Sequence, residues 1–409
     1  MRARCLSLNR RWRDLAHFSV RSRLQRRLLD VGEPVDFDAV ENAFEDAVTQ
    51  RVFPGAVVLA AREDEIVYEQ AFGSRSLVPS KSPMQASTIF DLASLTKPLA
   101  TTTAMMLLVS EQKVGLEDRV TRFFPAFGVL GKDDVMIRHL LNHSSGLPDW
   151  KPYYKEVREC EQQGKINFVA SQSAKRHVFE QVHREAPLSP AGQRCLYSDL
   201  GFMVLGEIIE TVGGMALDYF CQERIFKPLG LARTSFIDLT RLSTRPFASG
   251  EEMIAPTENC PWRKRVLCGE VHDDNAYAVG GVAGHAGLFS SARDIHQLLK
   301  RLNGCLQGKD SFLPQALVRE FLSKDETVEN STRTLGWDTP SEKQSASGQL
   351  FSPKSVGHLG FTGTSVWWDL EKHCHIVLLS NRVHPTRKNE KITKFRPYIH
   401  DLIMQALNP

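Results

Sequence analysis

Strand-like segments occur in pairs at the two ends of this 409-residue sequence, and a long helical stretch lies between the pairs. Each segment is rich in β-branched, aromatic and small apolar residues and is bounded by polar turns, as is typical of a buried strand. A short charged turn joins the first two segments, so we expect them to pair antiparallel. The simplest arrangement places all the segments in one antiparallel sheet, with the middle of the chain inserted as a separate lobe. The segments cover residues 55–61, 65–72, 364–370 and 374–380.

Apolar residues at helical spacing predict the helices that accompany this sheet. We expect an α/β (α+β) fold in which helices flank the antiparallel sheet and an all-helical lobe occupies about residues 100–285. A cleft between two such parts is a common place for a ligand site. Pro397 is expected in the first turn of the last helix, where its missing N–H group costs no intrahelical hydrogen bond. The clearest predicted helices cover residues 37–47, 98–112, 200–212 and 397–408.

Basic residues are concentrated at the N-terminus. The chain carries a net charge of +3, but residues 1–27 hold nine Arg and one acidic residue and contribute +8, so the other residues sum to −5. We therefore expect residues 1–33 to form a basic arm and residues 34–409 to form one folded domain. The arm is interpreted either as an amphipathic helix that makes weak membrane contact or serves as a transit peptide, or as a poorly ordered extension. The mildly acidic body argues against nucleic acid as a partner.

The sequence contains no segment with the length and composition of a secretory signal or a membrane-spanning helix. Its longest charge-free stretch, residues 275–292, contains four Gly and is expected to be buried loop or strand. The eight Cys are scattered without a C-x-x-C pair, which favours free thiols in a reducing compartment. We therefore expect a cytoplasmic protein, and the composition leaves its oligomeric state open.

A candidate nucleophile lies in an S-x-x-K tetrad, Ser94 to Lys97. The tetrad follows a strand-like segment at 89–93 and precedes an apolar helical segment, and Pro98 fits only the first turn of that helix. Ser94 is then at a helix start, and Lys97 lies one turn further on the same face. A lysine in a poorly solvated pocket can take the serine proton or tune another base, and helix-terminal N–H groups can stabilise an oxyanion. The alternative is a helix cap beside a solvated lysine.

A second polar segment, Tyr197-Ser198-Asp199, lies directly before an apolar helical segment. A tyrosine at such a junction can point its hydroxyl into a cleft and serve as a general base. Asp199 can hold Lys97 electrostatically, or it can simply cap the helix.

A third segment, residues 358–364, reads His-Leu-Gly-Phe-Thr-Gly-Thr and leads into a predicted strand. Gly360 permits a ligand to approach the backbone closely. We expect the backbone N–H group of Phe361 to contribute to an oxyanion hole. The alternative is a glycine-rich turn between two strands.

In this order the three elements resemble the serine β-lactamase and penicillin-binding-protein superfamily, and most closely its class C β-lactamase branch. The superfamily motifs S-x-x-K, Y-x-N and K-T-G or H-x-G have counterparts here, and two further segments are similar to family segments. The likeness spans about residues 36–405. The matching segments are residues 94–97, 197–199 and 358–360, with 139–148 (HLLNHSSGLP) and 287–294 (GLFSSARD) as the further two.

The resemblance implies a β-lactamase/transpeptidase-like fold and a role for each matched residue. Ser94 would be acylated, and Lys97 and Tyr197 would share the proton transfers. The backbone N–H groups of Ser94 and Phe361 would form the oxyanion hole, and His358 would face the substrate from the sheet edge. The resemblance implies neither a metal ion nor another cofactor.

Two positions depart from the family pattern. Asp199 stands where asparagine is usual, and an ionised carboxylate favours protonated Lys97. This shifts our expectation for the base to Tyr197, with Lys97 as its cationic partner. His358 replaces the lysine of K-T-G and is largely neutral near pH 7. A largely neutral histidine offers less positive charge to a β-lactam or peptide carboxylate than a lysine does. This favours ester or amide hydrolysis over strong β-lactamase activity.

We therefore expect a metal-independent serine hydrolase that forms an acyl-enzyme with a small-molecule ester, a D-configured amide or a peptidoglycan-like substrate. Esterase, D-aminopeptidase, DD-peptidase and weak β-lactamase activities all fit this description. The alternative is a catalytically weak penicillin-binding or sensor module that acylates without efficient turnover. Histidine pairs at 139 and 143 and at 373 and 375 have metal-like spacing, but their surroundings favour structural roles. His285 is interpreted as lining the cleft or packing beside it.

Overall fold

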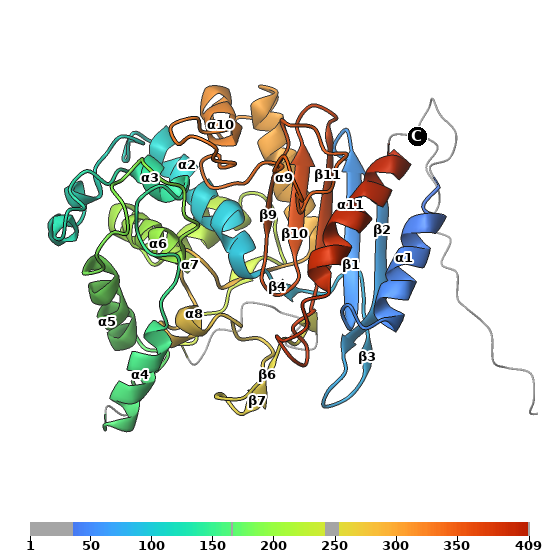
Figure 1. The fold of residues 1–409 in the computed structure, drawn as a ribbon, viewed down its shortest axis with the longest axis horizontal. Helices are drawn as coiled ribbons and strands as arrows, with labels where there is room; N and C mark the ends of the chain where they lie inside the picture. The colour runs from blue at the N-terminus through green and yellow to red at the C-terminus, as the bar shows by residue number, and fades with distance from the viewer. Residues whose placement is uncertain (1–35, 165–166, 242–252, 408–409) are drawn as a thin grey trace, which may run out of the picture. The chain divides into compact units, whose positions relative to one another are not determined.

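The computed structural model describes residues 36–164, 167–241 and 253–407, so the predicted basic arm lies outside the described residues. A six-stranded antiparallel sheet with the strand order β3-β2-β1-β11-β10-β9 runs through the fold (Figure 1). β1 pairs with β11 along its length, from Ala56 opposite Ser380 to Arg62 opposite Cys374. The prediction that both chain ends build one sheet is thus confirmed. The strands are β1 (Gly55–Arg62), β2 (Glu65–Ser76), β3 (Ser82–Pro83), β9 (Val356–Leu359), β10 (Ser365–Asp369) and β11 (Cys374–Ser380).

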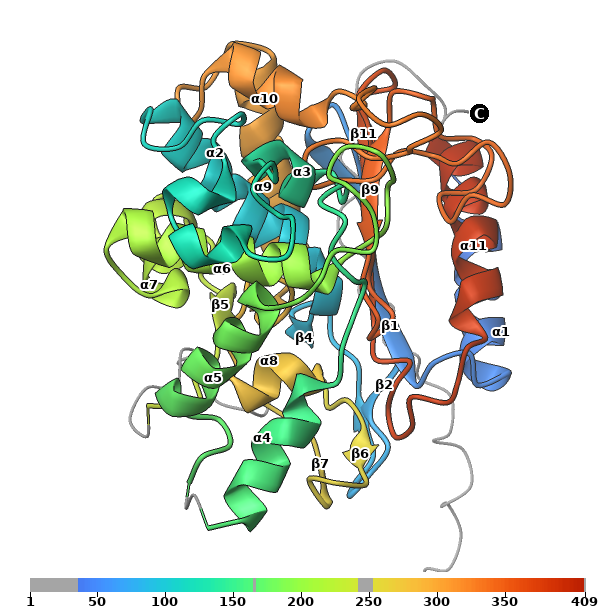
Figure 2. The same cartoon turned by 60° about the vertical axis from the view of Figure 1, so that its left-hand side comes forward.

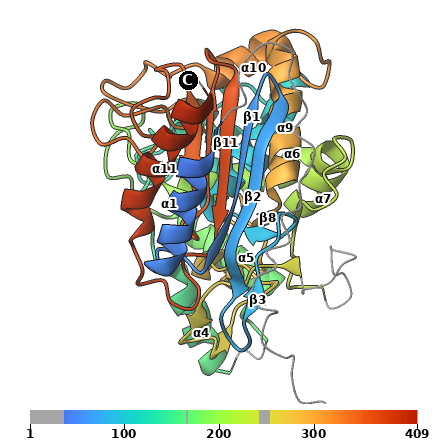
Figure 3. The same cartoon turned by 90° about the vertical axis from the view of Figure 1, so that its right-hand side faces the viewer.

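Both faces of this sheet are covered, which explains why its central strands read as continuous apolar runs rather than as alternating ones. The helices α1 (Asp38–Thr49) and α11 (Ile392–Leu407) lie side by side on one face (Figure 3). Phe44 of α1 meets Phe395 of α11 edge-on, with ring centroids 5.4 Å apart. The helix α9 (Ala292–Leu306) packs against β1 and β11 from the other face.

The last helix begins earlier than the sequence predicts. α11 starts at Ile392, so Pro397 lies inside the helix and not in its first turn. Ile392 and Phe395 are both buried in the apolar cluster between α1, α11 and the sheet. Burial of these two side chains stabilises the helix ahead of the proline, although proline removes one backbone hydrogen bond.

The middle of the chain forms a mainly helical region beside the sheet (Figure 2). Its most buried long helix is α6 (Asp199–Gly213), which contacts α2, α3, α5 and α7. Short strands also occur in this region, since β5 joins β4 and β8 in a three-stranded sheet and β6 pairs with β7, so the predicted lobe is not purely helical. The helices are α2 (Thr103–Ser110), α3 (Ile137–Leu141), α4 (Tyr153–Gln162), α5 (Gln172–His183), α7 (Leu217–Cys221), α8 (Asp274–Ala278) and α10 (Gln315–Leu322), and the strands are β4 (Phe90–Asp91), β5 (Ser235–Phe236), β6 (Asn259–Cys260), β7 (Arg265–Val266) and β8 (Leu288–Ser290).

The charge-free stretch at residues 275–292 contains most of α8, buried glycine-rich turns and β8. The prediction that it is buried is confirmed, although its first residues are helical. Within the described ranges no single helix has the length and apolar composition to cross a membrane. One bent pair, Asp199–Gly213 with Leu217–Phe226, meets that test jointly, and its first member is the core helix α6.

Candidate active site

Ser94 lies on a sharp turn that connects β4 to the first helix of the middle region. A single helical turn, Ala93–Leu95, carries it, and a wider π-helical turn, Lys97–Thr102, follows with Pro98 near its start. Ala93 has a φ of 47°, in the left-handed region that L-residues seldom adopt. The carboxylate of Asp91 holds this conformation by accepting the Ala93 N–H at 2.8 Å. The predicted position of Ser94 at a helix start is confirmed, and the strained turn leaves Ser94 partly exposed between buried neighbours.

Lys97 is buried completely beneath Ser94. Its Nζ lies 3.1 Å from Ser94 Oγ, 3.0 Å from the backbone oxygen of His285 and 2.7 Å from Oδ1 of Asp199. The ammonium group donates hydrogen bonds to Ser94 and to the His285 backbone, and it forms an ion pair with Asp199. The one-turn spacing predicted from the sequence therefore brings the lysine directly to the serine hydroxyl.

The electrostatic surroundings keep Lys97 charged. Burial acts to lower its pKa, but the Asp199 carboxylate and the Tyr197 side chain act in the other direction, and the net pKa is raised above its ordinary value. Lys97 is thus protonated near neutral pH. In this state it can stabilise negative charge on nearby oxygens, but it cannot accept a proton.

Tyr197 completes a triangle with Ser94 and Lys97. Its side chain interacts electrostatically with both of these side chains, and the Lys97 Nζ lies 4.9 Å from the centre of its ring. Burial raises the pKa of Tyr197, and the opposing effect of Lys97 does not reverse this. The resting enzyme therefore holds a neutral phenol beside a protonated lysine.

The start of α6 explains why Asp199 is available to Lys97. The residue that caps this helix is Ser198, whose Oγ accepts the Gly201 N–H at 3.2 Å, so Asp199 has no capping role. His143 supports the same junction from below, because its Nδ1 accepts the Ser198 N–H at 3.1 Å. Burial, with Arg333 and Lys97 nearby, lowers the pKa of His143 well below its ordinary value. The neutral imidazole has the structural hydrogen bond that the sequence led us to expect.

The segment that follows β9 is clamped against the turn that precedes Ser94. A Cβ atom on Gly360 would lie 2.0 Å from Thr364 Oγ1 and 2.5 Å from the backbone oxygen of Leu92, so only glycine fits there. The hydroxyl of Thr362 donates to the backbone oxygen of Asp91 at 2.7 Å. These contacts hold the backbone at Phe361 beside the nucleophile turn, where the oxyanion hole is expected.

His358 faces this site as a neutral side chain. Its Nδ1 lies 2.9 Å from the backbone oxygen of Leu359, a contact in which Nδ1 carries the hydrogen, and its ring centre lies 5.9 Å from that of Tyr197. The buried Nε2 has no hydrogen-bond partner among the described residues. Burial first, and then Lys97 and Arg333, lower its pKa well below the ordinary value. His358 therefore offers a free lone pair and not a positive charge.

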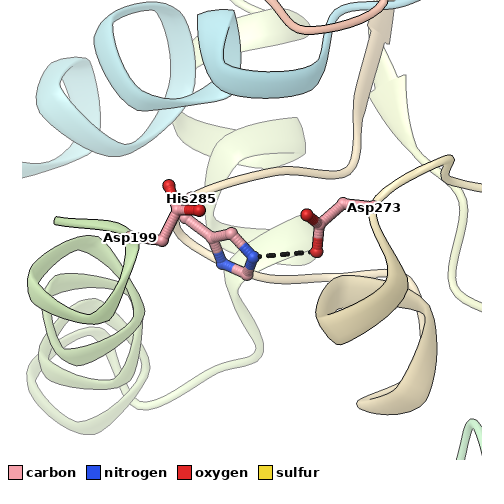
Figure 4. Close-up of side chains that lie close together, drawn as sticks. All are labelled: Asp199, Asp273 and His285. Atoms are coloured by element: carbon pink, nitrogen blue, oxygen red, sulfur yellow. Dashed lines mark hydrogen bonds and ion pairs between the residues drawn. The ribbon is translucent and has the colours of Figure 1, made fainter. Parts of the chain in front are cut away.

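The sequence reasoning assigned no chemical role to three residues of the site, which are Arg333, His285 and Asp273. The guanidinium of Arg333 lies 5.4 Å from the Tyr197 ring centre and 3.3 Å from Asp338. His285 was assigned to lining or packing, yet its backbone oxygen binds Lys97, and its Nε2 lies 3.1 Å from Oδ1 of Asp273. Figure 4 shows the His285 ring between Asp199 and Asp273. The His285-Ala286-Gly287 sequence was a signal for His285, whereas Arg333 lies in a long irregular segment without a motif.

The same group has some features of a metal site. One oxygen each of Asp199 and Asp273 and one ring nitrogen of His285 lie within 4.8 Å of one another. However, the protonated Lys97 lies 2.7 Å from Asp199 and would repel a divalent ion there. The donor set therefore fits an ammonium group better than a metal ion.

A comparison with known protein families identifies the family to which this chain belongs. The Beta-lactamase family profile matches residues 40–397. The chain therefore belongs to this family of serine enzymes, as the sequence motifs predicted.

Two curated relatives sharpen this assignment, and both bear the name "Putative D-alanyl-D-alanine carboxypeptidase". One, from Escherichia coli (strain K12), is 33% identical over 367 residues, which cover 84% of this chain and 82% of the relative. The other, from Salmonella paratyphi B, is 33% identical over 361 residues, which cover 83% and 81%.

Solved structures confirm the fold. EstCE1, described as a hydrolase with promiscuous acyltransferase activity, superposes with a TM-score of 0.67 at 23% identity and covers 89% of this chain and 97% of its own. The octameric penicillin-binding protein homologue from Pyrococcus abyssi gives a TM-score of 0.68 at 21% identity, with coverage of 90% and 78%. The family and the two curated relatives fit a serine hydrolase that acts through an acyl-enzyme on esters or amides, and they do not favour a sensor module.

Proposed function

We propose that this protein is a class C-like serine peptidase that removes a C-terminal residue with a free carboxylate from D-configured peptides. The observation that carries the proposal is the position of Arg333 over the Tyr197 ring, 5.4 Å from its centre. The name of the curated relatives supports the same substrate class. His358 supplies no charge at the sheet edge, so Arg333 is the cation that a substrate carboxylate would meet beside Tyr197.

The proton transfers follow from the protonation states of the two side chains that contact Ser94. In acylation, Ser94 Oγ bonds to the substrate carbonyl carbon and gives its proton to the Tyr197 oxygen. Tyr197 gives its own proton to the leaving nitrogen as the amide bond breaks, so the phenol is neutral before and after the step. Protonated Lys97 stabilises the negative charge that develops on both oxygens and keeps its protons.

Deacylation reverses this path with water in place of the leaving group. The attacking water gives a proton to Tyr197, and Tyr197 gives its proton to Ser94 Oγ as the acyl–oxygen bond breaks. The backbone N–H groups of Ser94 and Phe361 are proposed to hold the oxyanion in both steps. Gly360 and Asp199 support this machinery, the first by close packing and the second by holding Lys97.

The leaving group is expected to lie on the Arg333 side of the site. Tyr197 must reach the leaving nitrogen, and a C-terminal residue carries its carboxylate only two bonds from that nitrogen. A guanidinium beside the Tyr197 ring is therefore placed to bind this carboxylate with charge-assisted hydrogen bonds. The side chain of Arg333 is 18% exposed, so it is accessible yet partly shielded from water.

The test compares N-acetyl-D-alanyl-D-alanine with its C-terminal amide. We expect the wild type to prefer the acid, and we expect Arg333→Gln to reduce this preference about tenfold, mainly through KM. Arg319→Gln, which removes a charge from the exposed face of α10, is the matched control and should leave the preference unchanged. Ser94→Ala should abolish turnover of both peptides.

Three results would overturn the proposal. Equal turnover of the acid and the amide would exclude carboxylate recognition by the site. Hydrolysis of p-nitrophenyl acetate without cleavage of either peptide would identify an esterase instead of a peptidase. Persistent acylation of Ser94 without product release, seen by intact-protein mass spectrometry, would restore the sensor alternative.

A further inference from the structure

Two buried arginines hold the backbone of the segment that follows β9. Nη2 of Arg396, on α11, donates to the backbone oxygens of Gly360 and Thr364 at 2.8 and 2.9 Å. Nε of Arg382 donates to the backbone oxygen of Phe361 at 2.9 Å. Figure 2 shows α11 across the sheet from α2, the helix that follows the nucleophile turn. Arg396 therefore reaches this segment from behind the active site.

Neither guanidinium forms an ion pair with a carboxylate among the described residues. Both arginines are buried, and Glu390 acts on Arg382 only from a greater distance. Burial and the neighbouring Arg382 lower the pKa of Arg396 to about 10, so Arg396 is still charged near neutral pH. Its buried Nε has no hydrogen-bond partner in the described part of the chain. A buried charge without a counter-ion is costly, so the position of these side chains needs an explanation other than stability.

The contact between Arg396 and Gly360 fixes the direction of the next N–H group. The peptide bond from Gly360 to Phe361 is trans, since both cis bonds found in the described residues precede proline. The C=O and N–H groups of a trans peptide point in opposite directions, so the Phe361 N–H points away from Arg396. It has no hydrogen-bond partner among the described residues. This N–H group is therefore free to bind an oxyanion.

We infer that Arg396 is a positioning residue for the oxyanion hole, because it holds the Gly360 oxygen and so aims the Phe361 N–H at the oxyanion. A charged donor on the carbonyl also polarises the same peptide group and strengthens its N–H as a donor. Arg382 holds the next carbonyl along the chain and keeps the residue from turning. The inference rests on the proposed function only for the place of the Phe361 N–H in the oxyanion hole, and not for the identity of the substrate.

A residue with this role acts on the transition state and not on substrate binding. The N–H contact strengthens as charge develops on the substrate oxygen, and the same N–H group serves acylation and deacylation. Loss of its alignment should therefore lower kcat and kcat/KM together and leave KM nearly unchanged.

The experiment measures hydrolysis of p-nitrophenyl acetate by the full-length protein and its inhibition by phenethyl trifluoromethyl ketone. Ser94 Oγ adds to the ketone carbon, and the former carbonyl oxygen becomes an oxyanion, so the affinity reports the oxyanion hole directly. In Arg396→Met we expect kcat and this affinity each to fall about tenfold, with KM changed less than about twofold. Arg396→Lys should recover most of both losses, since one nitrogen makes both native bonds and an ammonium group can replace it.

Lys132→Met is the matched control. Lys132 is also a fully buried cation, and its Nζ donates to the backbone oxygens of three residues in the helical region, Val129, His183 and Glu185. This variant should keep the wild-type kcat and ketone affinity, and an equal loss would mean that Arg396 acts only through stability. Circular dichroism and urea unfolding report whether each variant folds, and Arg396→Gln, with the same expected result, replaces Arg396→Met if the latter does not fold.

A double-mutant cycle tests whether Arg396 acts through the Phe361 N–H. Phe361→Pro removes this N–H group, whereas Phe361→Ala removes the ring and keeps the N–H. We expect the ketone to bind Phe361→Pro at least about tenfold more weakly than Phe361→Ala. In the proline background, Arg396→Met should weaken binding by less than about a further twofold.

Three results would refute the role of Arg396. They are an unchanged kcat and ketone affinity in folded Arg396→Met, a loss that Arg396→Lys does not recover, and an effect of Arg396→Met that persists in full with Phe361→Pro. Failure of the proposed function gives different patterns. Wild-type ketone affinity in Phe361→Pro would remove this N–H from the oxyanion hole. If neither acetylated dipeptide is cleaved while the ester results hold, the peptidase is rejected and the role of Arg396 stands.

Discussion

Replacement of Asp199 by Asn tests the protonation states on which the mechanism depends. The substitution keeps the size and shape of the side chain and removes the charge that lies 2.7 Å from Lys97 Nζ. Burial acts to lower the pKa of Lys97, and the Asp199 carboxylate is the largest effect that opposes it. Without this carboxylate the pKa of Lys97 should fall.

The size of the effect follows from the geometry of the pair. An opposite charge at this distance moves the pKa of a buried group by about 1–3, which corresponds to roughly 1.4–4 kcal/mol. Lys97 is fully buried and the Asp199 side chain is 16% exposed, so solvent screens the pair little. Because the mechanism requires protonated Lys97, the alkaline limb of the rate profile should move to lower pH by about 1–3 pH units in Asp199→Asn.

The assay is kcat/KM for p-nitrophenyl acetate between pH 5 and 10.5. Asp218→Asn provides the matched control, because Asp218 has a similar exposure of 15% and an ion pair with Arg241 at 3.1 Å, on a different helix. The control variant should keep the wild-type pH profile. If Asp199→Asn were instead faster than the wild type near pH 8, neutral Lys97 would be the base and the phenol relay would be wrong.

Two further predictions concern the framework around the site. Gly360→Ala would place a methyl group 2.0 Å from Thr364 Oγ1 and 2.5 Å from the Leu92 oxygen. We expect the unfolding free energy measured in urea to fall by about 2 kcal/mol and kcat to fall at least tenfold. Wild-type turnover would show that the oxyanion hole does not need this close packing. Burial acts to raise the pKa of Glu258, but the neighbouring His272 and Arg387 side chains lower it to about 2. Because the pKa of Glu258 is lower in the folded protein than its ordinary value, the ionised side chain stabilises the fold at a pH above that ordinary value, and this stabilisation is lost as the pH falls toward 2. Glu258→Gln should therefore cost at most about 3 kcal/mol of unfolding free energy at pH 7 and much less at pH 3. A pH-independent difference would contradict this reasoning.

Local patterns explain what the sequence could predict. The spacing of Ser94 and Lys97 places both on one face of a helical turn, so their contact follows from local geometry alone. Trp367 and Trp368 alternate along β10 and pack into different apolar clusters on the two faces of the sheet, as the strand period requires. The pairing of both chain ends followed from the similarity of their strand patterns.

Residues placed by tertiary packing could not be found in this way. Arg333 reaches Tyr197 from a segment with no period, and the Asp273–His285 pair joins the residue that caps α8 to the glycine-rich turn before β8. The sequence also left open whether Asp199 caps α6, because Ser198 and Asp199 are both good capping residues, and one residue of register decides whether the Asp199 carboxylate is free.

The pairing of β1 with β11 has a consequence for how the enzyme becomes active during synthesis. Ala56 is synthesised well before its partner Ser380, since 380 − 56 = 324 positions separate them in the chain. Contacts between such distant segments form late in folding. A nascent chain therefore holds Ser94 and Lys97 long before it holds Gly360, and the turn that carries Ser94 gains the segment clamped against it only after that segment has been synthesised.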